Sequence, residues 1–274
     1  MGIDLNHGSG FVYGRIGHAI SVSDRVNALI DAALVARNRR QQQRDYLGGS
    51  RIGEPCARKL VYEVTHTPKD EGRDFDGAIL RIFDAGHQFE TLSIRWLRGA
   101  GFDLRTERAD GGQFGFEAAG GKLRGHIDGV IVAGPDVGLR WPVLWEHKAL
   151  KASSWSDTAK KGVQLSKPVY FGQMQIYMAY MGLGSALFTA LNKDTCELYH
   201  EHVPFDPAAA QALSDKAVDV LRAADAGDLL PRIATSPDFF LCRFCPFAAR
   251  CWGEPRPGNS PGESFSRERA EPSA

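Results

Sequence analysis

Residues 144–148 have the sequence Leu-Trp-Glu-His-Lys. The segment 143–150 is apolar and predicts a buried strand. Side chains alternate along a strand, so Glu146 and Lys148 share one face. A carboxylate and an ammonium group two residues apart are abundant in proteins, and the plainest interpretation is a salt bridge on an exposed face of a sheet. A catalytic interpretation needs further polar residues close by.

A second carboxylate lies on the preceding predicted strand, 122–132, in the sequence Gly-His-Ile-Asp-Gly. A turn containing Gly134 joins this strand to the next, and the connection would bring Asp128 beside Glu146. Two carboxylates and a lysine on one face make a hard oxygen site of the kind that Mg²⁺ or Mn²⁺ occupies. Such a cation polarises a phosphodiester and lowers the pKa of its bound water. The cluster is therefore a candidate site for phosphodiester hydrolysis.

Two predicted helices add polar side chains. On the helix over 81–98, His87 and Glu90 fall on the apolar stripe that should be buried. They could be further metal ligands, or His87 could simply bond to Glu90 inside the core. On a helix that begins at Pro168, Gln173 and Tyr177 are four residues apart and share a face. They could reach a substrate phosphate or Lys148, although ordinary core packing explains them as well.

The cysteines form another constellation. Five are present, an odd number that makes a poor disulfide framework. Cys242, Cys245 and Cys251 lie within ten residues, and the distant Cys56 would complete a set of four ligands. Spacing alone allows a zinc ion or a [4Fe–4S] cluster. Either would clamp the N-terminal helical region to the C-terminal segment and couple metal binding to folding. Cys196 lies in a predicted strand and is assigned no role.

Composition limits the classes of partner. The 33 basic and 33 acidic residues give zero net charge, so nucleic-acid binding needs a local basic patch. Residues 148–167 supply one, with five lysines against one aspartate at the end of the predicted strand and on a predicted polar loop over 151–167, where Trp155 could stack on a base. No apolar run approaches the roughly 18 residues of a membrane span. The N-terminus lacks a secretion signal, so we expect a cytoplasmic protein with no membrane contact.

The order of predicted elements points to the α/β class with a mixed sheet. Further elements are a helix over 24–44 capped by Ser23, a helix near 56–62, a hairpin of 186–191 and 196–203, and a helix from Pro207 to Gly227. Residues 1–19 look loosely structured, and 253–274 have the composition of a disordered tail.

Taken in order, these motifs resemble the PD-(D/E)xK nuclease superfamily, in its RecB-like branch that carries an iron–sulfur cluster. AddB-type nuclease domains, CRISPR-adaptation exonucleases and phage recombination exonucleases are similar. The resemblance covers roughly residues 52–252. It implies a restriction-endonuclease-like mixed central sheet flanked by helices, with the cluster joining the N-terminal and C-terminal segments. It also implies a helical extension at 1–50, a nuclease domain at 51–252 and a disordered tail at 253–274.

The resemblance implies roles position by position. The metal ligands would be His87, Asp128, Glu146 and the backbone carbonyl of His147. The catalytic set would be Asp128, Glu146, Lys148, Gln173 and Tyr177. The cluster ligands would be Cys56, Cys242, Cys245 and Cys251, which favours [4Fe–4S] over zinc. Glu90 is a possible extra metal ligand.

The implied function is a metal-dependent DNA nuclease, above all an exonuclease in recombination, repair or phage DNA processing. A site-specific endonuclease, a non-catalytic DNA-binding module with a structural metal and an iron–sulfur electron carrier are the alternatives. The sequence contains no Gly-x4-Gly-Lys-Ser/Thr motif, so any ATP-driven unwinding would come from a helicase partner. A recombinase or a single-strand-binding protein is the other expected partner.

Overall fold

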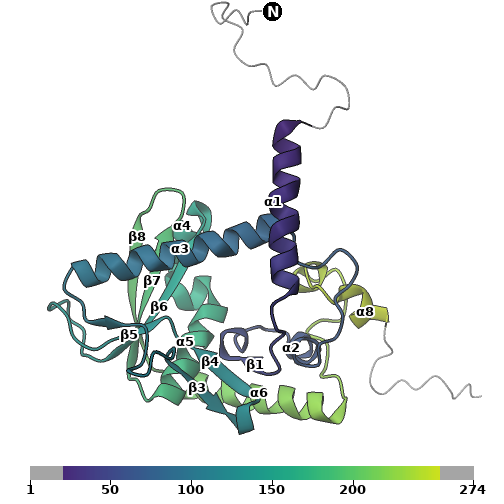
Figure 1. Cartoon of the computed structure of the whole chain (residues 1–274). Helices are drawn as coiled ribbons and strands as arrows, with labels where there is room; N and C mark the ends of the chain where they lie inside the picture. Colours follow the sequence, from purple (N-terminus) through teal and green to yellow (C-terminus); the bar gives the residue numbers. More distant parts are fainter. Residues whose placement is uncertain (1–20, 254–274) are drawn as a thin grey trace, which may run out of the picture. The chain divides into compact units, whose positions relative to one another are not determined.

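The computed structural model of the chain describes residues 21–253 (Figure 1). By their contacts these residues fall into two compact units, 21–42 with 75–82 and 43–74 with 83–253. Every candidate site residue belongs to the second unit. The loosely structured start and the disordered tail that the sequence predicts lie outside the described residues, except for Gly253, which ends a helix.

The structure is mixed α/β, in agreement with the prediction. The α-helices are α1 (Val22–Arg39), α2 (Ala57–Val64), α3 (Gly77–Gly99), α4 (Ala152–Ser166), α5 (Pro168–Met181), α6 (Pro207–Ala226), α7 (Phe240–Arg243) and α8 (Ala248–Gly253). The strands are β1 (Leu47–Gly48), β2 (Leu104–Arg105), β3 (Gly115–Ala118), β4 (Leu123–His126), β5 (Gly129–Ile131), β6 (Val143–Leu150), β7 (Ser185–Asn192) and β8 (Leu198–Pro204). Two short 3-10 helices are η1 (Gly49–Arg51) and η2 (Ala119–Gly121). Across residues 21–253, no helix has both the length and the apolar character that crossing a membrane requires.

The strands form two sheets. The larger has the order β2-β5-β6-β7-β8 and is mixed, because β6 and β7 run parallel while the other neighbours run antiparallel. The smaller has the order β1-β4-β3, with β1 parallel and β3 antiparallel to β4. In Figure 1, β5, β6, β7 and β8 lie side by side.

One strand of the prediction is two strands in the structure. The expected strand over 122–132 is interrupted at Ile127 and Asp128. The part before them pairs in the smaller sheet and the part after them pairs in the larger one. Long-range pairing decides this division, which alternation of side chains along the sequence does not reveal. Asp128 consequently lies where the chain passes from one sheet to the other.

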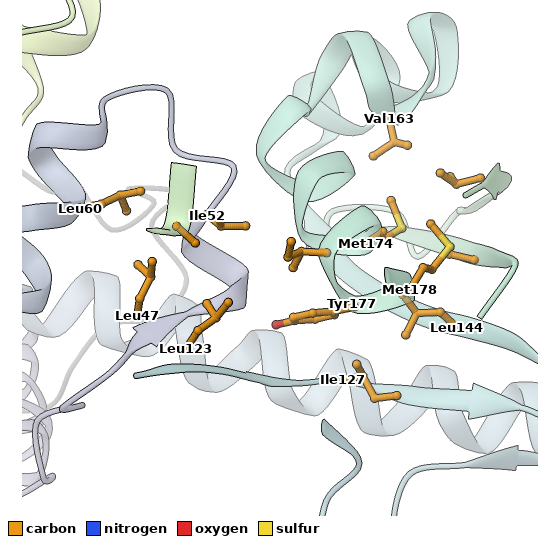
Figure 2. Packing of buried hydrophobic residues seen from close by; sticks show 14 of the residues in the cluster. Leu47, Ile52, Leu60, Leu123, Ile127, Leu144, Val163, Met174, Tyr177 and Met178 are labelled. Atoms are coloured by element: carbon orange, nitrogen blue, oxygen red, sulfur yellow. The ribbon is translucent and has the colours of Figure 1, made fainter. Parts of the chain in front are cut away.

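The central strand β6 is covered on both faces. Leu144 belongs to a core that includes Met174 of α5 (Figure 2). Trp145, which points the opposite way, belongs to a second core that includes Leu97 of α3. Burial on both faces explains why residues 143–150 are an almost continuous apolar run rather than an alternating one.

Helix ends follow local signals where those signals are strong. Pro168 begins α5, and Gly182 ends it in the left-handed conformation. Asp206 caps α6 by accepting hydrogen bonds from two backbone N–H groups, and Gly227 ends it. The predicted start of the first helix is wrong, because Ser21 rather than Ser23 is the cap. Ser21 forms a reciprocal capping box with Asp24, and the helix ends earlier than expected, at Arg39.

The predicted loop over 151–167 is also wrong. Residues 152–166 form α4, which bends at Gly162, where φ is 77°. Thr158 and Val163 on this helix are buried. Trp155 packs against the core, and its Nε1 donates a hydrogen bond to the backbone oxygen of Ala190 at 3.0 Å. This indole is therefore part of the fold and not the exposed stacking platform that the sequence suggested.

Cys196 does not lie within a strand. It is exposed in the turn between β7 and β8 with φ of 63°, so the prediction that it lies in a strand is wrong. The turn around Lys193 and Asp194 is where the sequence placed it.

Candidate functional site

Glu146 lies on β6 with its side chain fully buried. Its Oε1 pairs with Lys148 Nζ and accepts a hydrogen bond from Gln173 Nε2 on α5 at 2.7 Å. Its Oε2 is buried, and no hydrogen-bond donor within residues 21–253 reaches it. One oxygen of this carboxylate is thus held by two donors, while the other has no partner in that part of the chain.

Asp128 lies directly beside this strand. Its Oδ2 accepts a hydrogen bond from the backbone N–H of His147 at 2.8 Å. Burial, followed by the negative charge of Asp128, raises the pKa of Glu146 to about 8, although Lys148 acts in the opposite direction. The structure therefore brings together Asp128, Glu146 and Lys148, which the sequence placed on neighbouring strands.

Glu90 is a third carboxylate at this point. It lies on α3, and its pKa is raised to about 7 by burial and then by the charge of Asp128, with Lys148 opposing the shift. Glu90 also contributes to the raised pKa of Glu146. The pKa values of Glu90 and Glu146 are therefore both raised in part by the charge of Asp128, which indicates that the three carboxyl groups lie close together.

His87 does not lie on the buried side of α3, contrary to the expectation. Its side chain is exposed, whereas Ser93 and Leu97 are the residues of this helix that the second unit buries. The apolar stripe misled the prediction because two of its members, Ile82 and Trp96, are themselves exposed, at 54% and 39%. Sequence periodicity located the helix and placed Leu97 and Ile94 on its buried side, but it extended that side too far toward His87.

Lys148 remains positively charged. Burial alone would lower the pKa of its ammonium group, but Glu146 and Asp128 outweigh burial and raise it above the ordinary value. The Nζ atom also lies 5.2 Å from the centroid of the Tyr170 ring, within reach of a cation–π interaction. A lysine held in this way supplies a fixed positive charge and hydrogen-bond donors.

Tyr177 lies one helical turn beyond Gln173 and is buried. Its pKa is raised by burial and then by the charge of Glu146, so the phenol is neutral. The ring packs edge-on against Phe116, with centroids 5.9 Å apart. A Cβ atom at Gly49 or Gly125 would lie 2.6 Å from Tyr177 Cε1, so these glycines allow the close approach of backbone and ring.

The imidazole of His147 points away from the carboxylates. Its Nε2 lies 3.0 Å from Ser93 Oγ on α3, and both side chains are buried. Burial, and then the charge of Lys148, lowers the pKa of His147 to about 3, so the ring is neutral. Sequence reasoning missed Ser93, although its position three residues after Glu90 on the same helix was a usable signal.

The four expected cysteines line one small cavity. Cys56 is the N-cap of α2, Cys242 and Cys245 lie at and just after α7, and Cys251 is in α8. Burial raises the pKa of Cys56 and of Cys245, and the proximity of Cys251 adds to both shifts. Segments almost two hundred residues apart in the sequence therefore meet at this cavity.

Neither the acidic cluster nor the cysteine cavity has its side chains arranged as the ligands of a single ion. Over residues 21–253, no three His, Cys, Asp or Glu side chains are grouped at the spacing of ligands on one metal. In the acidic cluster, Glu146 Oε1 is already paired with the ammonium group of Lys148. In the cysteine cavity, the four cysteines share the lining with seven other residues.

Comparison with known proteins gives only remote similarity. No protein-family model matches the sequence, and no curated protein does. The similar solved structures include an alkaline exonuclease from Laribacter hongkongensis, 17% identical with a TM-score of 0.48 over 72% of this chain and 93% of the exonuclease. The structure of the same exonuclease with dAMP is 17% identical, with a TM-score of 0.48 over 73% of this chain and 93% of the exonuclease. The structure of SSO0001 is 15% identical in sequence, with a TM-score of 0.44 over 83% of this chain and 96% of SSO0001. At these values, the similarity does not assign an activity to this chain.

Proposed function

We propose that the chain is a divalent-metal-dependent deoxyribonuclease of the PD-(D/E)xK superfamily. The observation that supports this most strongly is the convergence of Glu90, Asp128 and Glu146 with Lys148 beside β6. A structural salt bridge needs one carboxylate and one cation. Three carboxylates around one lysine leave an excess of negative charge that a structural role does not explain.

Carboxylate oxygens of this kind are the ligands that a hard divalent cation prefers, although the three carboxyl groups would have to draw closer together to bind one ion. The buried Oε2 of Glu146 lacks a donor among the described residues, and the raised pKa values of Glu90 and Glu146 reflect burial first and then repulsion, which a cation would reduce. When bound, Mg²⁺ or Mn²⁺ would polarise a phosphodiester and lower the pKa of a coordinated water. Glu90, Asp128 and Glu146 would hold the ion. Exposed His87 and the backbone carbonyl of His147 remain predicted additional ligands.

The other side chains would act on the substrate and on the carboxylates. Lys148, as an ammonium group, would orient the attacking water and offset negative charge that develops on the phosphate. Gln173 holds Glu146 Oε1 and thereby orients Oε2. Tyr177 is buried beneath the site, and we assign it the role of positioning Gln173 rather than of contacting DNA.

We test this with purified protein and end-labelled DNA in Mg²⁺ or Mn²⁺, with chelator as the blank. Glu146→Gln and Lys148→Ala should each lower the cleavage rate at least about 100-fold, because each removes charge from the reacting centre. Glu71→Gln and Lys122→Ala change exposed residues of the same types and should cleave like the wild type. Glu146→Gln that cuts DNA at the wild-type rate contradicts the proposal.

The finer proposal is that the enzyme degrades DNA from its ends in recombination, repair or phage DNA processing. We expect linear DNA to be digested to small products while covalently closed circles stay intact. Cleavage of circles into discrete fragments would instead indicate a site-specific endonuclease. A cytoplasmic location and a helicase, recombinase or single-strand-binding partner belong to the same proposal.

We also propose that Cys56, Cys242, Cys245 and Cys251 hold a [4Fe–4S] cluster, with zinc as the alternative. Support comes from the shared cavity and from backbone N–H groups that donate to the sulfurs of Cys56 and Cys245. Anaerobic purification, with assays of iron, sulfide and zinc and a visible absorption spectrum, separates the two metals. Protein that contains neither metal after anaerobic reconstitution contradicts this part.

A further inference from the structure

Arg58 is a buried cation that has no carboxylate partner within residues 21–253. It lies on α2, two residues after Cys56, and is 1% exposed. No Asp or Glu within residues 21–253 forms an ion pair with it, and its Nε has no hydrogen-bond partner there. A buried charge costs several kcal/mol unless an opposite charge compensates it, so the position calls for an anion.

The one group that Arg58 contacts by hydrogen bonding in the described chain is a sulfur. Its NH1 lies 3.6 Å from Cys251 Sγ, on the wall of the four-cysteine cavity. Neutral thiols do not compensate a cation. Cysteine binds metals as thiolate, so four cysteines around a zinc ion or an iron–sulfur cluster carry a net negative charge.

The charged residues that line the cavity, Glu54, Lys59 and Arg232, each have another partner. Glu54 lies 2.7 Å from Lys59 Nζ and 3.1 Å from Arg51. Arg232 donates to the backbone oxygen of Cys251 at 3.0 and 2.5 Å, and its guanidinium lies 5.0 Å from the Trp252 ring centroid. Arg58 differs from them in its burial and in having only a cysteine sulfur as a hydrogen-bond partner among residues 21–253.

Arg58 also lines a hollow on α6 that contains Asp219, Arg222 and Asp228. Neither aspartate forms an ion pair with Arg58, and two acidic and two basic side chains give the hollow no excess of positive charge. An anion is therefore better accommodated on the cysteine side of Arg58 than in this hollow.

We propose that Arg58 is the buried counter-ion of an anionic metal–thiolate centre held by Cys56, Cys242, Cys245 and Cys251. The inference rests on the proposed cysteine site but not on the nuclease site. Arg58 stabilises the loaded state of the centre and is an uncompensated charge when the cysteines are protonated and empty. Removal of the Arg58 charge should therefore destabilise the metal-loaded protein and stabilise the metal-free protein.

The first test measures metal retention. Wild type, Arg58→Met, Arg58→Lys and Arg222→Met are reconstituted anaerobically with ferrous iron and sulfide, or with Zn²⁺, and then exposed to excess chelator. Arg58→Met keeps the length of the side chain but removes its charge, and should lose metal at least tenfold faster than the wild type. Arg58→Lys should fall between them, and Arg222→Met, an exposed arginine of the adjacent hollow, should match the wild type.

The second test separates a counter-ion from a packing residue. Urea unfolding is measured on the loaded and on the metal-free forms. Arg58→Met should lower the stability of the loaded form while leaving the metal-free form as stable as the wild type or more so. Equal destabilisation of both forms indicates packing alone and overturns the proposal, as does wild-type metal retention.

Added inorganic phosphate provides the remaining control. If phosphate stabilises the metal-free wild type and Arg58→Met abolishes only that effect, the anion belongs in the hollow and the proposal is wrong. The nuclease assay is independent of these measurements. A chain that never cleaves DNA would refute the proposed enzyme while leaving the role of Arg58 supported or refuted by metal retention alone.

Discussion

Glu146 shows how one position combines local and long-range effects. Its place on a strand and its contact with Lys148 follow from its neighbours in the sequence, but its complete burial and its contact with Gln173 of α5 arise from tertiary packing. The pKa of about 8 reflects that environment. At neutral pH and without a cation, much of this carboxyl is protonated.

The raised pKa of Glu146 predicts a pH-dependent stability of the metal-free protein. Because the folded pKa of about 8 lies above the ordinary 4.5, the folded state holds a proton that the unfolded chain releases. This contribution is complete below about pH 4.5 and is lost as the pH rises through 8. Glu146→Gln cannot titrate, so relative to the wild type it should gain on the order of 3 kcal/mol in unfolding free energy between pH 5 and pH 8.

The measurement is urea unfolding of both proteins in chelator at a series of pH values. The difference between the two proteins isolates Glu146 from the other titrating groups, including Glu90, which titrates in both. A difference that stays constant with pH contradicts the buried environment of this carboxyl.

At the scale of elements, α3 and β6 are joined by a buried hydrogen bond between Ser93 and His147. This contact fixes the helix that carries Glu90 against the strand that carries Glu146. The two side chains face away from the carboxylates. The hydrogen bond therefore positions Glu90 and Glu146 through the backbone of α3 and β6 and not by direct contact.

Ser93→Ala should destabilise the protein by about 1–3 kcal/mol, because it leaves the buried Nε2 of His147 without a partner. Displacement of Glu90 should also weaken Mn²⁺ binding, which isothermal titration calorimetry measures. Thr91→Ala removes a hydroxyl from the exposed face of the same helix and should change unfolding by less than about 0.5 kcal/mol. Equal effects of the two variants would show that the hydrogen bond has no positioning role.

The approach of β4 to α5 depends on the absence of a side chain at Gly125. A Cβ atom there would lie 2.3 Å from Phe116 Cε1 and 2.6 Å from Tyr177 Cε1. Gly125→Ala should therefore cost about 1–3 kcal/mol of stability through overpacking. Gly86→Ala, at a helical position with open space around the added atom, should be neutral or stabilise by up to about 1 kcal/mol. Thermal unfolding of both variants provides the comparison.

At the scale of the whole molecule, zero net charge means that binding to DNA depends on where charges gather. Lys160 and Lys161 are exposed on α4, and Lys161 is paired with Asp157 at 2.6 Å. Lys160 is therefore the better candidate for a phosphate contact. Lys160 lies on a helix and not on the loop that the sequence predicted.

Lys160→Ala should reduce the slope of log affinity against log salt concentration by about 0.9, the value for one phosphate contact on duplex DNA. We would measure this by fluorescence anisotropy in the Glu146→Gln background, so that the DNA is not cleaved. Lys122→Ala, which removes a charge that pairs with Asp225, should leave the slope unchanged. Identical slopes for all three proteins would exclude Lys160 from the DNA contact.

The sequence by itself determined the elements whose signals are local. The apolar run of β6, the proline and glycine that bound α5 and the Asp206-Pro207 start of α6 each depend on neighbours within a few residues. The order of motifs also anticipated that Asp128 and Glu146 would meet, and that four cysteines would share a cavity.

The tertiary structure decided the rest, because those features depend on contacts between distant segments. The division of residues 122–132 between two sheets comes from strand pairing, and the exposure of His87 comes from the way α3 packs. The bond between Ser93 and His147 and the burial of Arg58 beside Cys251 join residues 54 and 193 positions apart. No local pattern encodes such distances, since burial and pairing energies appear only when the chain has folded.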